Sequence, residues 1–217
     1  MTAEVRWDHS REGRTGIPEV IFGPGKTVAQ VVTLFQEAEG FRFATRLNED
    51  QMAALEGLAT VDPVSRTAVK DPRPLRRQPP VAVITAGTGD IPWATEAKAV
   101  LEALGHPAKA FFDVGVAGLH RMQAILPELR ECPVVIVCAG MEGALPSVLA
   151  GLIDAPLIAV PTPIGAGISE GGTVALHGML ASCSPGIAVV NIGNGFGAAC
   201  MAIKFMNRIG KLEREER

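Results

Sequence analysis

The sequence lacks a hydrophobic run long enough to cross a membrane, and it lacks a strong charge of either sign. No stretch of about 18 uncharged apolar residues occurs, so we expect no membrane-spanning helix. The formal net charge is only -3, which argues against a nucleic-acid partner, because phosphates require a basic face. Residues 1–14 are charged and contain no apolar segment of the signal-peptide kind, which predicts a cytoplasmic protein.

Cysteine is also scarce, and its spacing excludes some kinds of site. The four cysteines are Cys132, Cys138, Cys183 and Cys200. No pair has the C-x-x-C spacing of a zinc or redox site. In a reducing compartment we expect free thiols, most of them small buried hydrophobic groups.

Proline marks a change in composition near residue 80. Five prolines lie between residues 62 and 80, mixed with the basic residues Arg73, Arg76 and Arg77. Proline restricts its own backbone and that of the preceding residue, so residues 63–80 are predicted to be an extended, solvated linker. The chain is thereby divided into a small α+β N-terminal domain (residues 1–62) and a second domain (residues 81–217).

The first domain carries two helix-start signals. We expect a helix over residues 27–39 with Thr27 as N-cap, a strand over residues 42–45, and a second helix over residues 48–59. Asn48 followed by Gln51 has the spacing of a capping box.

The second domain alternates between short apolar runs and helix-like segments. Strands are expected at residues 81–85, 108–112, 133–138, 156–160 and 187–192. Helices are expected at residues 92–104, 118–130, 143–153, 171–181 and 195–208. Continuous apolar strands are typical of a parallel sheet covered on both faces. This pattern predicts a doubly wound, three-layer α/β domain with a five-stranded parallel sheet.

Glycine is concentrated where these strands end. Glycine-rich loops follow the first, third, fourth and fifth strands, at residues 85–90, 139–143, 161–167 and 193–197. Carboxyl ends of parallel strands are where such sheets bind ligands, and backbone N–H groups at helix starts favour anions. Glycine also serves plain turns, but four such loops at one edge indicate a phosphate or nucleotide site.

Four side chains near that edge are candidates for chemistry, and each has a structural alternative. Asp90 precedes Ile-Pro and suits a helix N-cap, or it binds a sugar hydroxyl. His120 is structural or moves protons near neutral pH, and Arg121 is solvated or pairs with a carboxylate or phosphate. Glu142 caps a helix, or serves as a general base or magnesium ligand.

Cys183 is a further candidate whose position counts against it. It precedes the fifth strand, so we expect it at the edge opposite the glycine loops, where a buried and inert thiol is the default. A role in the site would require an unusual crossover or delivery by a neighbouring subunit.

Several long motifs in order make a family resemblance specific. They are TAGTGDIP (residues 85–92), DVGVAGLHR (113–121), CAGMEGALPS (138–147), MLASC (179–183) and VVNI (189–192), together with PEVIFG (18–23), Lys26 and ATR (44–46). The chain resembles the LarB family, which is similar in fold to the carboxylase of purine synthesis (PurE-like, flavodoxin-like).

The resemblance implies an activity. LarB enzymes perform the first step of nickel-pincer nucleotide cofactor synthesis: they carboxylate the pyridinium ring of nicotinic acid adenine dinucleotide and hydrolyse its phosphoanhydride. The products are pyridinium-3,5-biscarboxylic acid mononucleotide and AMP. The family's nucleophilic cysteine falls on Cys183 and its key glutamate on Glu142. By position, His120 and Asp90 resemble the histidine and the sugar-binding aspartate of the purine carboxylases.

The loops and the resemblance together define the expected site. Catalysis is assigned to Cys183, Glu142 and His120. Substrate contacts are expected from Thr88, Gly89, Asp90, Asp113, Arg121, Gly140, Met141, Gly165, Gly167 and Asn194. We expect no tightly bound cofactor, carbon dioxide or bicarbonate as co-substrate, and Mg2+ or another divalent cation, with Glu142 as its ligand.

The resemblance also predicts the state of assembly, and it shows two positions at which this sequence differs from the family pattern. Purine carboxylases are octamers, so a homo-oligomer with sites near subunit interfaces is expected. The family pattern has serine where Gly89 stands and aspartate where Gly193 stands. Loss of the serine hydroxyl would weaken phosphate binding or leave it to backbone amides, and loss of the aspartate counts against metal binding at that position. A changed substrate or impaired hydrolysis would follow.

Two alternatives stay open from the sequence. One is a carboxylase or mutase acting on aminoimidazole ribonucleotide, which needs no cysteine. The other is a non-catalytic nucleotide-binding homologue, which the glycines at positions 89 and 193 would suit.

Overall fold

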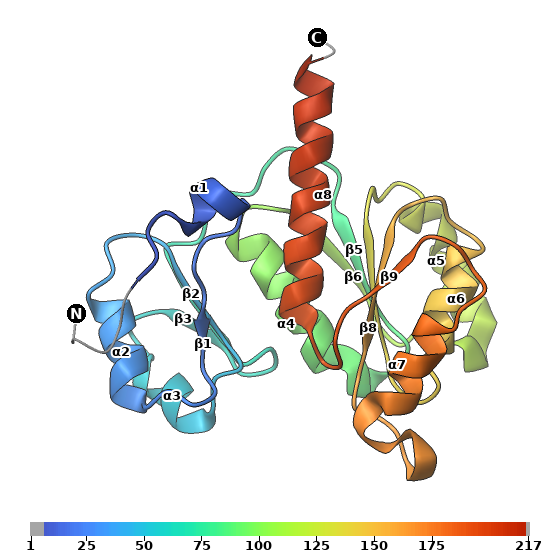
Figure 1. Ribbon diagram of the computed structural model, residues 1–217, viewed down its shortest axis with the longest axis horizontal. Helices are drawn as coiled ribbons and strands as arrows, with labels where there is room; N and C mark the ends of the chain where they lie inside the picture. The colour runs from blue at the N-terminus through green and yellow to red at the C-terminus, as the bar shows by residue number, and fades with distance from the viewer. Residues whose placement is uncertain (1–6, 216–217) are drawn as a thin grey trace.

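The computed structural model describes residues 7–215, apart from the side chains of residues 213 and 214, and it forms two α/β units (Figure 1). The smaller unit comes first. Its elements are α1 (Arg11–Thr15), β1 (Ile21–Phe22), α2 (Val28–Gln36), β2 (Arg42–Thr45), α3 (Glu49–Ala54), β3 (Thr60–Asp62) and β4 (Thr67–Lys70).

A mixed sheet with strand order β1-β2-β4-β3 organises this unit. β1 runs parallel to β2, whereas β4 pairs antiparallel with both β2 and β3. Helices α2 and α3 pack on one face of the sheet around the buried side chains of Phe35, Leu47 and Leu55. The unit therefore has a hydrophobic core of its own.

The two helix-start signals are confirmed. The Thr27 hydroxyl accepts a hydrogen bond from the Gln30 backbone N–H at 3.2 Å, and the Asn48 side chain accepts one from Gln51 at 2.8 Å. The second helix is shorter than predicted, ending at Ala54 instead of residue 59. The chain turns there because Gly57 adopts a left-handed φ of +80°, which a helix cannot include.

The predicted linker is wrong over its first part. Residues 67–70 form β4, which pairs with two strands of the first sheet and buries Ala68 completely. Proline and basic residues surround this four-residue strand in sequence, so composition alone hides it. The connection between the units is the segment 71–80. It is pinned to the second unit, since the backbone N–H of Arg73 donates to Ala103 and that of Arg76 donates to Gly105.

The second unit contains the remaining elements. These are β5 (Val81–Thr85), α4 (Ile91–Ala103), β6 (Ala108–Phe111), α5 (Leu119–Leu129), β7 (Val135–Ala139), α6 (Ala144–Ala150), β8 (Leu157–Pro161), α7 (Thr173–Leu180), β9 (Ile187–Val189) and α8 (Gly195–Glu215). Short 3-10 turns η1 (Thr88–Asp90), η2 (Val116–Gly118) and η3 (Gly167–Gly172) lie in the loops after β5, β6 and β8. Each predicted strand and helix is present, and α8 continues beyond its predicted end.

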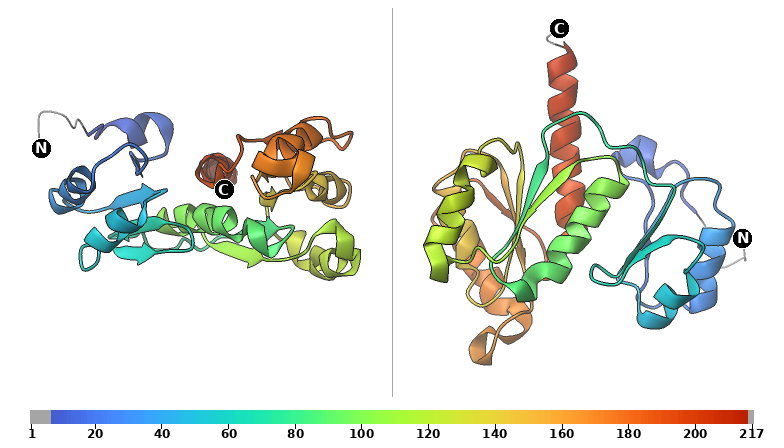
Figure 2. Two further views of the ribbon diagram at one scale, coloured as in Figure 1. Left: turned by 90° about the horizontal axis from the view of Figure 1, so that it is seen from below. Right: turned by 180° about the vertical axis from the view of Figure 1, so that it is seen from behind.

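All five strands of the second unit are parallel, in the order β6-β5-β7-β8-β9. This is the flavodoxin-like order of a doubly wound sheet, which confirms the predicted fold class. Strand residues alternate between two cores. Val83 and Ile136 face α4 and α8, whereas Ile84 and Val137 face α5, α6 and α7. The three layers are visible in Figure 2.

The small unit packs on the α4 and α8 side of the large one. Ile17 and Phe43 join the same buried cluster as α4 and α8. α8 runs between the two units and projects beyond them at its C-terminal end (Figures 1 and 2). Within the described residues, none of the helices is both long enough and apolar enough to span a membrane.

Candidate active site

The carboxyl ends of β5 and β7 form the topological switch point of the large sheet. The chain leaves β5 for α4 on one face and leaves β7 for α6 on the other. Loops that diverge in this way open a crevice where doubly wound proteins bind their ligands. The loops after β5, β7 and β8, predicted to bind the substrate, meet at this edge.

Asp90 is buried at the centre of these loops, with only 3% of its surface exposed. It occupies the N-cap position of α4, but its side chain makes no capping bond to that helix. One carboxylate oxygen accepts the Thr162 hydroxyl at 2.5 Å and the other accepts the Gly87 backbone N–H at 2.8 Å. The helix-cap interpretation is therefore correct for the position and wrong for the hydrogen bond.

The environment of Asp90 acts on its ionisation in two directions. Burial raises the pKa of the Asp90 carboxyl above its ordinary 3.8, because desolvation disfavours the charged form. Hydrogen bonds from Thr162, Gly87 and Gly140 act in the lowering direction. Asp90 thus links the loops after β5, β7 and β8.

Gly140 and Met141 join the β7 loop to the β8 loop. The Met141 backbone N–H donates to the Ile164 carbonyl at 2.7 Å, and Met141 adopts a left-handed φ of +53°. A Cβ on Gly140 would stand 2.1 Å from the Ile164 carbonyl oxygen, so only glycine fits. This close approach explains why a glycine stands at position 140. The Met141 side chain, by contrast, is about half exposed to solvent.

The remaining predicted loop glycines differ in their surroundings. A Cβ on Gly165 would lie 2.3 Å from the Ser169 carbonyl oxygen, whereas Gly167 has open space around it and a φ of +59°. Thr88 and Gly89 are exposed at the turn before α4. At Gly89 a Cβ would meet only the flexible Ile164 side chain, at 3.2 Å. This turn is therefore open to a ligand.

The loop after β6 brings Asp113 and Arg121 together as an ion pair. The backbone N–H of Asp113 also donates to the Thr85 hydroxyl at 2.9 Å, which ties this loop to the end of β5. Both charged side chains are more than a third exposed, so the pair itself contributes little to stability. His120 is exposed in the first turn of α5, next to this pair.

Glu142 is exposed at the mouth of β7. Its backbone carbonyl packs against Gly178 of α7, where a Cβ would approach it to 2.3 Å. Within the part of the chain that the structure describes, no three His, Cys, Asp or Glu side chains converge to hold a metal. Glu142 alone does not provide the set of oxygen ligands that a resident Mg2+ requires.

Cys183 differs from the other three cysteines. Its side chain is exposed, whereas Cys132 and Cys138 are buried and Cys200 is partly buried. Burial raises the pKa of the Cys200 thiol to about 12 and that of Cys138 well above its ordinary value. The default expectation of a buried, inert thiol is thus wrong for Cys183.

Two serines hold the turn that carries Cys183. The Ser147 hydroxyl of α6 donates to Ser182 at 2.7 Å, and the Ser184 hydroxyl donates to the Ser147 carbonyl at 2.7 Å. This turn follows α7 and leads into β9, which is parallel to β8, so it lies at the amino edge of the sheet. A single chain therefore does not bring Cys183 to the carboxyl edge of the sheet where Asp90 lies.

Residues of the loop after β9 make contacts within the protein that stabilise the fold. The Asn194 side-chain oxygen accepts the Gly197 backbone N–H at 2.8 Å, so Asn194 caps α8. Gly193 has a left-handed φ of +65°, and a Cβ there would stand 2.8 Å from the indole nitrogen of Trp93. Asn194, predicted to contact substrate, has its side-chain oxygen engaged in the helix cap.

Sequence reasoning missed a buried carboxylate that connects this loop to the small unit. Glu96 of α4 is 3% exposed. It accepts the Thr45 hydroxyl at 2.5 Å, the Arg46 guanidinium at 3.3 Å and the Phe196 backbone N–H at 3.2 Å. Arg46 also donates to the Gly193 carbonyl at 2.5 Å. The ATR motif (residues 44–46) was the available signal, but its partners lie 50 or more residues away.

Family comparisons match both units. Residues 2–71 match the LarB/PurE-like N-terminal domain, and residues 80–214 match AIR carboxylase. The chain belongs to the LarB branch of the AIR carboxylase family. The match to the LarB/PurE-like N-terminal domain ends at residue 71, one residue after the end of β4 at Lys70. The matched region therefore includes the whole of the first sheet.

Two curated relatives of this LarB-type chain come from Methanocaldococcus jannaschii. One is an uncharacterized protein, 42% identical over 213 residues, covering 91% of this chain and 82% of the relative. The other is named N5-carboxyaminoimidazole ribonucleotide mutase, 29% identical over 133 residues, covering 58% of this chain and 78% of the mutase. The family assignment supports a carboxylase-like protein.

Proposed function

We propose that this LarB-type chain carboxylates the pyridinium ring of nicotinic acid adenine dinucleotide and hydrolyses the phosphoanhydride to release AMP. The observation that carries the proposal is the exposed thiol of Cys183, the last residue of the MLASC motif, which stands between two hydrogen-bonded serines, Ser182 and Ser184. Chemistry on aminoimidazole ribonucleotide needs no such thiol. The LarB/PurE-like N-terminal domain supports the same choice.

The proposed carboxylation begins with the Cys183 thiolate. A pyridinium ring is electron-poor and does not attack carbon dioxide. Addition of the thiolate to a ring carbon makes a C–S bond and converts the ring to an enamine-like dihydropyridine, whose 5-carbon is nucleophilic. That carbon forms a C–C bond to carbon dioxide. A base then removes the proton from the 5-carbon, the C–S bond breaks, and the departing thiolate restores the aromatic ring.

Two groups at the loop edge are candidates for the base. Glu142 and His120 are both exposed beside the switch point, on the loop after β7 and in the first turn of α5. Either one could accept the ring proton. Hydrolysis adds water to the bridging phosphoanhydride and releases AMP. We propose that the exposed turn at Thr88 and Gly89 and the guanidinium of Arg121 contact the phosphate oxygens.

Assembly is part of the proposal, because Cys183 and the loop edge are apart within one chain. We propose that a second copy presents its Cys183 to the glycine loops. Large apolar side chains are exposed around both regions, including Met141 at the loops, Leu119 at the start of α5, and Leu180 beside the cysteine turn. Contact between copies would remove these side chains from water.

The test is a product assay with nicotinic acid adenine dinucleotide and 13C-bicarbonate, read by mass spectrometry. Wild type should give labelled biscarboxylated mononucleotide and AMP, and Cys183→Ala should give no labelled product. Cys200→Ala is the matched control, and it should keep activity because that thiol is partly buried. Binding of the dinucleotide by folded wild type without any product would contradict the proposal and favour a non-catalytic homologue.

One observation favours a second candidate function. The mutase relative covers more than half of this chain and carries no LarB-type name. Aminoimidazole ribonucleotide and its N5-carboxy derivative should therefore be assayed in parallel. Conversion of these substrates by both wild type and Cys183→Ala would replace the pyridinium proposal with a purine-type carboxyl transfer.

A further inference from the structure

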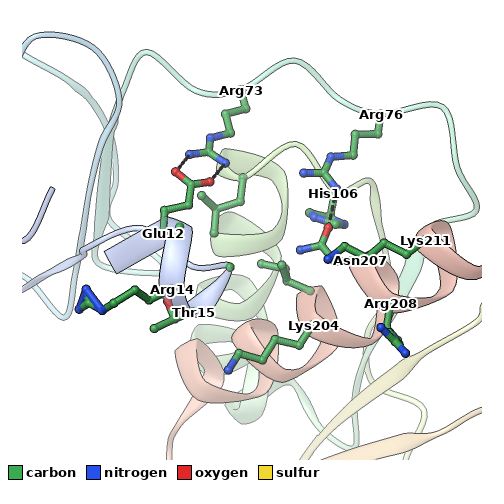
Figure 3. Close-up of a pocket in the computed structure, with 14 residues that line it drawn as sticks. Glu12, Arg14, Thr15, Arg73, Arg76, His106, Lys204, Asn207, Arg208 and Lys211 are labelled. Carbon is green, nitrogen blue, oxygen red and sulfur yellow. Dashed lines mark hydrogen bonds and ion pairs between the residues drawn. The ribbon is translucent and has the colours of Figure 1, made fainter. Parts of the chain in front are cut away.

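A cleft of about 740 Å³ lies between the small unit and α8, away from the glycine loops (Figure 3). One wall comes from α1 and the residues just after it, a second from α8, and a third from the connecting segment 71–80. His106, two residues before the start of β6, also lines it, so the cleft is at the amino edge of the large sheet. The proposed catalytic loops lie at the opposite, carboxyl edge.

The cleft is strongly basic in a chain whose net charge is -3. Within the described part of the chain, six basic side chains line the cleft and Glu12 is the only carboxylate that does so. Glu12 is already paired with Arg73 through two hydrogen bonds of 2.6 and 2.7 Å, and Arg76 binds the Asn207 amide oxygen at 2.6 Å. The basic side chains are thus gathered here in excess of the local acidic groups.

α8 contributes three of these cations from one face. Lys204, Arg208 and Lys211 are spaced four and three residues apart, so they share a side of the helix, the side that lines the cleft. Among the side chains that the structure describes, none of the three has a carboxylate partner within ion-pair distance. Like charges at this spacing repel, and a bound anion would relieve that repulsion.

His106 provides a second, independent observation. Its side chain is fully buried, and its Nδ1 lies 2.9 Å from the Gln78 side-chain nitrogen. Its other ring nitrogen, Nε2, has no hydrogen-bond partner within the described residues. Burial and the nearby Arg76 and Arg73 lower the pKa of His106 to about 4, so the ring is neutral near pH 7. When the Gln78 amide donates to Nδ1, the ring proton is on Nε2, a donor without an acceptor.

We propose that this cleft is a second binding site, which takes a small soluble phosphate compound carrying at least two negative charges. Several cations arranged around one space suit a multiply charged ligand, and the Nε2–H of His106 supplies a directed donor to a phosphate oxygen. The volume lies within the range of small-molecule pockets. The basic residues converge on one cleft between the units and do not form an extended stripe, which suits a compact ligand better than an extended nucleic acid.

The site would also join the two units. Its walls belong to α1, to the connecting segment and to α8, so a ligand held by all three would oppose their separation. Ligand binding to the folded state alone raises stability with ligand concentration. Binding should therefore raise the midpoint temperature of unfolding of the whole chain.

The experiment is calorimetric titration of the full chain with inorganic pyrophosphate, with inorganic phosphate as the weaker comparison, at fixed ionic strength. Arg208→Ala/Lys211→Ala should weaken pyrophosphate binding by about tenfold or more, since two charge-assisted contacts are lost. The matched control is Lys109→Ala/Arg130→Ala, which removes the same charge from exposed positions outside the cleft. The control should bind as wild type does.

The His106 contact has its own readout. In 15N-histidine spectra, pyrophosphate should shift the Nε2–H signal of His106, assigned by its loss in His106→Gln, and this shift should be absent in the α8 double variant. Absence of pyrophosphate binding up to roughly 10 mM, or equal weakening in both double variants, would overturn the proposal. So would binding only to vesicles with anionic phosphate headgroups, or loss of self-association in the α8 variant, which would assign the cleft to a membrane surface or a second copy.

Discussion

The hydroxyl of Thr162, directly after β8, donates a hydrogen bond of 2.5 Å to the carboxylate of Asp90, which lies after β5. The two residues are 72 positions apart in the sequence. β7 lies between these two strands in the sheet, and the Gly140 backbone of its loop also contributes a hydrogen bond to Asp90. One buried carboxylate therefore links the three loops that follow β5, β7 and β8 at the carboxyl edge of the sheet.

Thr162→Val should destabilise the protein and loosen the site. Leaving the buried Asp90 oxygen without its donor should lower the free energy of unfolding by about 1–3 kcal/mol in urea denaturation. The loss should be larger at pH 7 than below pH 3.8, because the folded-state pKa of Asp90 is raised and would rise further without Thr162. A raised acid stabilises the fold while protonated and loses that contribution as pH rises through its folded pKa. Thr162→Ser keeps the hydroxyl and should behave as wild type; an equal loss in both variants would count against the hydrogen bond.

The two departures from the LarB pattern should respond differently to restoration. Gly89→Ser should change the free energy of unfolding by less than about 1 kcal/mol, since its Cβ meets only the flexible Ile164 side chain, and it should tighten dinucleotide binding. Gly193→Asp should destabilise by roughly 2–4 kcal/mol, because the φ is +65° and the Trp93 indole stands 2.8 Å from the new Cβ. Thermal unfolding and dinucleotide titration measure both, and a stable Gly193→Asp protein would disprove the steric argument.

The junction between the units should show energetic coupling. Arg46→Ala and Glu96→Gln remove the two ends of an ion pair whose carboxylate side chain is only 4% exposed. Arg46→Ala should cost about 3 kcal/mol, because the Glu96 charge stays buried with one partner fewer. The double variant should lose less than the sum of the single losses, by about 1–3 kcal/mol. Additive losses in urea denaturation would mean that the pair is not coupled.

His106 should make stability depend on pH below neutrality. Its folded pKa of about 4 lies below the ordinary 6.5, so the unfolded chain takes up a proton first. Stability is complete above pH 6.5 and falls as pH decreases toward 4, by up to roughly 3 kcal/mol at 1.36 kcal/mol per pKa unit. His106→Gln should flatten this part of the curve, whereas His9→Gln, at an exposed position, should not. A steep profile that survives in His106→Gln would assign it to other groups.

Thiol reactivity should single out Cys183. Ellman's reagent at pH 8 should modify one thiol of the native chain quickly, because the Cys132, Cys138 and Cys200 thiols have raised pKa values and are at least partly buried. Cys183→Ala should remove the fast phase, and nicotinic acid adenine dinucleotide should slow it in wild type. A fast phase that persists in Cys183→Ala would contradict this assignment.

Local patterns in the sequence were enough to predict the architecture of the second unit and two helices of the first. The five apolar runs became the five parallel strands, and the caps at Thr27 and Asn48 start the expected helices. These features are set within windows of a few residues, by side-chain burial and by hydrogen bonds between near neighbours. The same windows hid β4, because four strand residues lie among prolines and basic residues that suggest a linker.

The sequence by itself thus determined the fold class, the glycine-rich edge and the family motifs. Tertiary structure decided which groups are buried and which meet. It put His106, whose Nε2 has no hydrogen-bond partner among the described residues, in the wall of a basic cleft. It also buried Glu96 against Arg46 and left Cys183 exposed. Such pairings join residues that are far apart in the chain, and their energies depend on desolvation and distance, which only the folded arrangement of the two units sets.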